Sequence, residues 1–149
     1  MTAPVFVDTN VLLYAVDAGD ARKQRAAMAW RSELWRTRRG RISYQVLQEF
    51  YAQAVRKSPK QAEAARAEVR DLFAWNPIAV DEAVIETAWG LQERYSLSFW
   101  DALIAAAAHT LGCPFLLTED LSHGQLLDGV RVVSPFRVAP SELADPAEP

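Results

Sequence analysis

Short apolar runs alternate along this chain with longer stretches in which apolar residues recur at helical spacing. The run at 4–7 (Pro-Val-Phe-Val) ends at Asp8, and further short runs lie at 41–43, 77–80, 115–117 and 130–133. Their length and composition predict short buried strands. Buried strands separated by helices are typical of a parallel sheet with helices on both faces. The pattern therefore predicts an α/β protein with a three-layer α/β/α arrangement.

The stretches between these runs carry the signals that begin and end helices. Asp20, Ser58, Asp81 and Ser98 are the expected N-terminal caps, and Gly112 is a stop. Each helix should bury its apolar stripe. The residues expected to point inward include Ala27, Trp30 and Leu34 in the first helix, Leu47, Phe50, Tyr51 and Ala54 in the next, Ala62, Ala65, Val69, Leu72 and Phe73 after Ser58, and Val84, Ile85, Ala88 and Leu91 after Asp81.

The length of 149 residues suits one domain, expected at 1–138, followed by an acidic, proline-rich tail at 139–149 that should be loosely ordered. The longest apolar run is 102–108, far short of the roughly 20 residues of a membrane span, and the N-terminus has no secretory pattern. A cytoplasmic protein is expected. One cysteine and two histidines exclude a disulfide framework and a thiolate or histidine-rich metal site. A metal would need oxygen ligands.

Four acids have positions that suggest a shared site. Asp8 and Asp120 each follow a predicted strand, and the carboxyl ends of parallel strands are where ligands bind. Glu49 and Asp101 lie in helices among apolar neighbours. Four carboxylates together would suit Mg²⁺ or Mn²⁺. Each acid also has a purely structural explanation: Asp8 and Asp101 as helix-capping residues, Asp120 as a turn residue, and Glu49 as a partly exposed helix residue.

The sequence segments around these acids resemble those of a known family. The segments VFVDTNVLLYAVD, QVLQEFY, LSFWDALIAAAA and LLTED, in this order across about residues 4–133, resemble the PIN-domain family and in particular the VapC-like toxins of bacterial toxin–antitoxin pairs. The resemblance implies a three-layer fold around a mostly parallel five-stranded sheet, and Mg²⁺-dependent endoribonuclease activity. It assigns catalytic and metal-binding roles to Asp8, Glu49, Asp101 and Asp120, and orienting roles to Asn10 and Thr118.

The charge distribution points to an anionic partner. Residues 21–60 hold eleven Lys/Arg and two acids, a local net charge of +9 in a chain of net charge −3. The resemblance implies an RNA substrate, a cognate antitoxin and a homodimer. The local positive charge makes Arg36, Arg38 and Arg39 candidate contacts to RNA or to the antitoxin. A solvated basic helix face is the alternative interpretation.

Other enzymes with an aspartate after the first strand fit less well. A haloacid-dehalogenase-type phosphatase needs a second acid where this chain has Asn10, and a response-regulator receiver needs a lysine in the 115–133 region. A dinucleotide-binding domain needs a glycine-rich first turn, which VDTNVLLY lacks. The remaining alternative is a PIN-like module that binds RNA or protein without cutting. The intact set of four acids argues against it.

Overall fold

The computed structural model describes residues 3–146, and its centre is a five-stranded sheet. The strands are β1 (Val5–Val7), β2 (Gly40–Arg41), β3 (Phe115–Leu117), β4 (Leu126–Leu127) and β5 (Val130–Val133), in the order β2-β1-β3-β5-β4. All neighbours pair in parallel except β4, which is antiparallel to β5. The predicted fold class, α/β with a mostly parallel five-stranded sheet, is confirmed.

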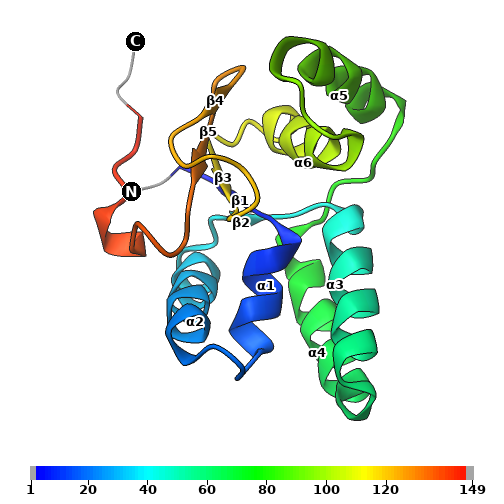
Figure 1. Cartoon of the computed structure of the whole chain (residues 1–149), viewed down its shortest axis with the longest axis vertical. Coiled ribbons are helices and arrows are strands. Elements are labelled where there is room, and N and C mark those ends of the chain that lie inside the picture. The colour runs from blue at the N-terminus through cyan, green and yellow to red at the C-terminus, as the bar shows by residue number, and fades with distance from the viewer. Residues whose placement is uncertain (1–2, 147–149) are drawn as a thin grey trace.

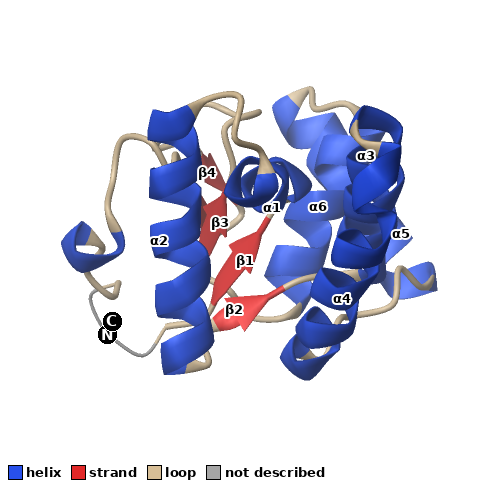
Figure 2. Ribbon diagram, turned by 90° about the horizontal axis from the view of Figure 1, so that it is seen from below, coloured by secondary structure: helices blue, strands red, loops and turns tan. Residues whose placement is uncertain are grey.

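In the described part of the chain, six α-helices flank this sheet. They are α1 (Thr9–Val16), α2 (Ala21–Thr37), α3 (Tyr44–Lys57), α4 (Ala62–Leu72), α5 (Glu82–Tyr95) and α6 (Phe99–Thr110). Seen from below, α2 lies on one side of the strands and α3, α4, α5 and α6 lie on the other, with α1 in front of them (Figure 1 and Figure 2). A second view shows α2 running alongside the strands (Figure 2). Residues 102–108 of α6 are all buried, because this helix packs between α5 and the sheet.

Three of the four predicted caps form as expected. The side chains of Asp20, Asp81 and Ser98 accept hydrogen bonds from backbone N–H groups three residues later, at the N-termini of α2, α5 and α6. Ser58 makes no such side-chain bond, and the prediction is wrong there. Pro59 instead opens a 3₁₀ turn, Pro59–Gln61, and α4 begins only at Ala62.

The inward faces largely match their prediction. Ala27, Trp30 and Leu34 are fully buried, and the indole Nε1 of Trp30 donates to the carbonyl oxygen of Val138 at 2.9 Å. Phe73 is the exception, since its side chain is 49% exposed. It stands at the start of a 3₁₀ turn, Phe73–Trp75, whose tighter winding turns it off the inward stripe of α4.

The strand predictions hold at 115–117 and 130–133 and fail in three places. The run at 77–80 contributes only an isolated bridge, between Ile78 and Ser43. The second strand is Gly40–Arg41, one residue earlier and shorter than expected. Strand β4 was not expected. It pairs with β5 across Asp128-Gly129, both at positive φ (47° and 89°), which is the backbone that a two-residue hairpin needs.

Part of the segment 139–149, which the sequence analysis expects to be a loosely ordered tail, has defined structure. Residues Pro140–Glu142 form a 3₁₀ turn, and Leu143 packs into the core with 8% of its surface exposed. Residues 147–149 lie outside the described part of the chain. Within residues 3–146, no helix has the length and apolar character needed to cross a membrane.

Candidate active site at the carboxyl edge of the sheet

Asp8 and Thr118 meet because β1 and β3 run in parallel and end at the same level. Val7 pairs with Leu117 in register, and the N–H of Asp8 donates to the carbonyl oxygen of Leu117 at 3.0 Å. The next residue of each strand therefore points off the same edge of the sheet. The hydroxyl of Thr118 donates to Asp8 Oδ2 at 2.8 Å. The orienting role expected for Thr118 has a direct contact in the structure.

The carboxylate of Asp8 caps α1 and faces the site at the same time. Its Oδ1 accepts from the N–H of Thr9 at 2.7 Å, and the side chain is 6% exposed. Burial raises the pKa of Asp8 from 3.8 to about 7, against the lowering effect of the bonds from Thr118 and Thr9; the charges of Asp120 and Glu49 raise it further. A carboxylate with a pKa near 7 holds a proton that a cation could replace.

Asn10 joins the two strand ends through its side-chain amide. Its Nδ2 lies 3.3 Å from Asp8 Oδ2, 3.0 Å from Thr118 Oγ1 and 3.1 Å from Asp120 Oδ2. Its Oδ1 accepts from the N–H of Glu119 at 3.3 Å. Asn10 thus bonds both Asp8 and the segment that carries Asp120.

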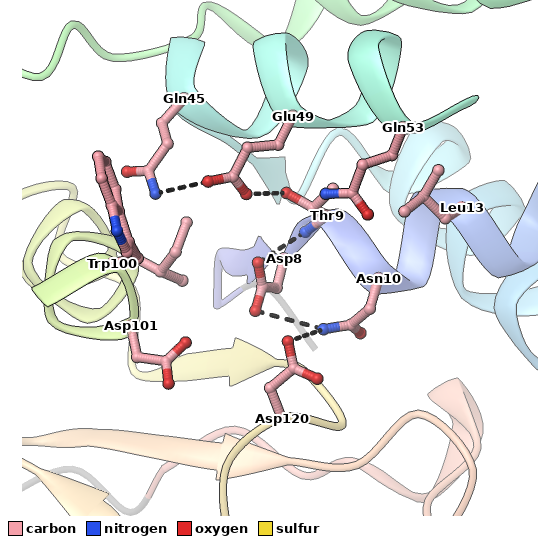
Figure 3. Close-up of a pocket in the computed structure, with 11 residues that line it drawn as sticks. Asp8, Thr9, Asn10, Leu13, Gln45, Glu49, Gln53, Trp100, Asp101 and Asp120 are labelled. Atoms are coloured by element: carbon pink, nitrogen blue, oxygen red, sulfur yellow. Dashed lines mark hydrogen bonds between the residues drawn. The ribbon is translucent and has the colours of Figure 1, made fainter. Parts of the chain in front are cut away.

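Glu49 enters the site from α3, held at both carboxylate oxygens. Thr9 Oγ1 donates to Oε2 at 3.0 Å, and Gln45 Nε2 donates to Oε1 at 3.1 Å. Gln45 is buried, and its own Oε1 is buried with no hydrogen-bond partner among residues 3–146. Gln45, Glu49 and Gln53 follow one another at four-residue spacing and present one face of α3 to the site (Figure 3).

Asp101 comes from the first turn of α6. The backbone N–H of Asp101 donates to Ser98 Oγ at 3.1 Å, so half of the expected capping box is present. Its carboxylate nevertheless faces the acids (Figure 3). Burial raises the pKa of Asp101; a hydrogen bond with the Ser98 side chain lowers it, and the charges of Asp120 and Glu49 raise it.

These side chains enclose a small cavity of about 100 Å³. All four acids expected from the sequence line it, together with Asn10 (Figure 3). The sequence interpretation did not select five further lining residues, Thr9, Leu13, Gln45, Gln53 and Ile104, nor Trp100, which is 63% exposed beside Asp101. The four-residue spacing around Glu49 was the signal that could have found Gln45 and Gln53.

The donor set is suited to a hard divalent cation. Carboxylates and amide groups surround the cavity, and no lysine or arginine of the described residues lines it. Within residues 3–146, no three His, Cys, Asp or Glu side chains stand close enough together to form a ready-made metal cage. The chemistry of the residues therefore fits Mg²⁺ or Mn²⁺, and the side chains would have to draw together around the ion.

The three candidate arginines lie elsewhere. Arg36 and Arg38 are exposed at the C-terminal end of α2, where Arg36 pairs with Glu33 at 2.6 Å. Arg39 is only 4% exposed, and its guanidinium donates to Thr37 Oγ1 and to the carbonyl oxygen of Ala3. It is therefore not available as a surface contact, because the chain folds over it.

The position of these arginines also separates them from the acids. The N–H of Val5 donates to the carbonyl oxygen of Arg39, so this end of α2 adjoins the amino edge of the sheet. The acids lie at the opposite, carboxyl edge. One strand of three residues, about 10 Å, separates the two edges.

A larger concave surface adjoins the acid site. It has a volume of about 780 Å³, lies between α1, α3 and α4, and shares Asn10, Leu13 and Gln53 with the smaller cavity. Its wall is mostly apolar, with Arg56 and Lys57 at the end of α3. The small polar cavity and the larger apolar one are thus neighbours that share three lining residues.

Comparison with known proteins gives a consistent result. The model of the PIN domain matches residues 5–126. No curated protein matches the chain by sequence. Among solved structures, a sarcin–ricin loop cleaving toxin of Mycobacterium tuberculosis, VapC20, is 27% identical, with a TM-score of 0.59 over 75% of this chain and 86% of the other.

Two further solved structures show the same fold. A toxin–antitoxin complex from Klebsiella pneumoniae contains a chain 24% identical, with a TM-score of 0.65 over 88% of this chain and 97% of the other. DNA-bound VapBC from Salmonella typhimurium contains one 17% identical, with a TM-score of 0.65 over 89% and 98%.

Proposed function

This chain belongs to the PIN-domain family, and on that premise we propose that it is a Mg²⁺-dependent endoribonuclease, the toxin of a toxin–antitoxin pair. The observation that carries the proposal is the convergence of Asp8, Glu49, Asp101 and Asp120 on one cavity that no lysine or arginine of the described residues lines. Carboxylates about 5 Å apart repel by roughly 3 kcal/mol per pair at an effective dielectric near 20. Mn²⁺ could take the place of Mg²⁺, because the two prefer the same ligands.

The chain's own residues would bind the cation and fix the acids around it. Asp8, Glu49, Asp101 and Asp120 are the proposed ligands, and Asp120 is the most exposed of them. The chemistry that such an ion supplies is a water of lowered pKa and a counter-charge for the leaving oxygen of a phosphodiester. Asn10 and Thr118 hold Asp8 and Asp120 in place, while Thr9 and Gln45 hold Glu49.

We further propose a cognate antitoxin as protein partner and a homodimer as the assembly. Support for the antitoxin comes from related structures that were solved as toxin–antitoxin complexes. Support for self-association comes from two exposed tryptophans, Trp89 on α5 and Trp100 on α6, on helices that pack together. Large exposed aromatic side chains are enriched at protein interfaces. Sedimentation of the purified chain alone tests the dimer.

The competing function is a PIN-like module that binds RNA or protein without cutting. Such a module would gain nothing from a buried carboxylate such as that of Asp8, whose pKa is raised by burial and by the charges of Asp120 and Glu49. The two functions differ in one measurable property, which is turnover of RNA in the presence of a divalent cation.

Cleavage of RNA by the purified full-length chain tests the proposal. We expect cleavage with Mg²⁺ or Mn²⁺, none in excess EDTA, and none for Asp8→Asn or Asp101→Asn. The matched control is Asp71→Asn, an exposed aspartate on α4 outside the cavity, which should cut like wild type. Cutting in EDTA, or undiminished cutting by either site variant, would refute the metal mechanism. Binding of RNA without any cutting would favour the module.

A further inference from the structure

Four side chains form a closed cluster just outside the acid site. The hydroxyl of Tyr14 (α1) donates to Glu119 Oε1 at 2.5 Å, and Lys23 Nζ (α2) donates to Glu119 Oε2 at 3.0 Å and lies 3.3 Å from the Tyr14 oxygen. The ammonium of Lys23 also lies 4.9 Å from the ring centre of Tyr14 and 5.0 Å from that of Phe136. The two rings meet edge to face at 5.2 Å. Both carboxylate oxygens of Glu119 are thus engaged.

Glu119 belongs to the segment that carries two residues of the acid site. Thr118 and Asp120 flank it and point to the cavity side, where Asn10 bonds both of them. The backbone N–H of Glu119 donates to Asn10 Oδ1, and that of Asp120 donates to Thr118 Oγ1 at 3.1 Å. The segment is therefore held on its inner side by Asn10 and on its outer side by Lys23 and Tyr14 through the Glu119 side chain.

We propose that Lys23, with Tyr14, is a positioning residue for Asp120, acting through Glu119. The proposal rests on the proposed function in one respect, since it treats Asp120 as a ligand of the cation. Lys23 lies in the basic block 21–60, for which the sequence predicted contacts to an anionic partner. Its ammonium is instead engaged by one carboxylate, one hydroxyl and two ring faces of its own chain.

Mn²⁺ affinity measured without RNA distinguishes this role from a simple charge effect, because the two predict opposite changes in affinity. Removing a positive charge near the acids should strengthen cation binding if charge alone matters. Loss of positioning should weaken it, and partners of metal-binding residues typically contribute 10- to 100-fold in affinity. We expect the Mn²⁺ dissociation constant of Lys23→Met to rise about 10-fold, and Lys23→Arg to restore it because Arg keeps the ion pair.

Lys57→Met is the matched control. Lys57 also pairs with a carboxylate, that of Asp17, and lies at the end of α3 beside the larger cavity. It has no contact with residues 118–120 among the described interactions. Its removal should leave Mn²⁺ affinity unchanged or slightly stronger. If both lysine variants shift the affinity in the same direction, the positioning role is refuted.

A second measurement needs no metal. Hydrogen exchange of the Glu119 and Asp120 amides, which both bond to side chains of the site, should quicken in Lys23→Met and stay as in wild type in Lys57→Met and Lys23→Arg. Unchanged exchange in Lys23→Met would overturn the proposal. If wild type binds no Mn²⁺, the proposed metal chemistry fails while this exchange result still decides the positioning role.

In RNA cleavage, a positioning role lowers kcat and leaves KM unchanged. A direct contact between Lys23 and RNA would instead raise KM and make it less dependent on salt. The second result would assign Lys23 to the RNA-binding surface and overturn the proposal.

Discussion

Replacing Asp8 with asparagine should remove a pH dependence of stability that originates in one buried carboxylate. Burial raises the pKa of Asp8 from 3.8 to about 7 in the folded, metal-free protein. Between these two values the folded state binds a proton that the unfolded chain has released. The stability of wild type therefore falls as the pH rises from about 4, and this loss is complete above the folded-state pKa of about 7.

The size of the effect follows from the shift. A difference of about three pH units corresponds to a total penalty of about 4 kcal/mol, of which about 3 kcal/mol develops between pH 5 and pH 8. Asparagine caps a helix as well as aspartate does. An asparagine has only one side-chain oxygen, so it can accept the hydrogen bond from Thr118 or the one from Thr9, but not both. Losing one of them lowers the free energy of unfolding by about 1–3 kcal/mol at every pH. That cost shifts the whole curve and leaves its slope unchanged.

Urea unfolding in EDTA at several pH values between 5 and 8 measures this slope. We expect the free energy of unfolding of wild type to drop by about 3 kcal/mol relative to Asp8→Asn across this range. Asp71→Asn should keep the wild-type slope, because Asp71 is exposed on α4. A difference between wild type and Asp8→Asn that stays constant with pH would refute the reasoning.

The stabilisation of wild type by added Mg²⁺ should change with pH in the opposite direction. The cation competes with the proton on Asp8, so the stabilisation by the cation should grow as the pH rises. At 100 times its dissociation constant a ligand adds about 2.7 kcal/mol. Asp8→Asn should gain much less at any pH, because it lacks one of the proposed ligands. Equal gains in both proteins would place the cation elsewhere.

Three other variants test separate parts of the structure. Metal-free Asp101→Asn should melt at or above the wild-type temperature, since burial raises the pKa of Asp101 and its cap bond uses the backbone N–H. A lower melting temperature with an equal response to Mg²⁺ would show that Asp101 is a capping residue only. Arg36→Gln combined with Arg38→Gln should weaken RNA or antitoxin binding and flatten its salt dependence without changing kcat, because both lie at the amino edge of the sheet; unchanged affinities and salt slopes would show a solvated face. Gly40→Ala should destabilise by about 1–3 kcal/mol in urea unfolding, because an added Cβ would lie 2.5 Å from the Trp75 ring; wild-type stability would show that the ring gives way.

Local patterns in the sequence were enough for most of the element types and for selecting four acids that line one cavity. Strand β1 and helix α2 are visible as a short apolar run and a capped stripe, because such periodicity is a property of neighbouring residues. Asp8 and Asp120 could be placed at one edge because parallel strands end together. The Asp128-Gly129 turn also carried a local hairpin signal, which the interpretation missed.

The tertiary structure alone decided which groups touch. Arg39 is buried and Lys23 is engaged by Glu119, although both belong to the same basic block. The pKa of Asp8 is raised by burial and lowered by the hydrogen bond from Thr118, which lies 110 residues away in the chain. Contacts of this kind arise from the way strands and helices pack together. They cannot be predicted from a pattern of neighbouring residues, because burial and pairing are properties of the folded chain as a whole.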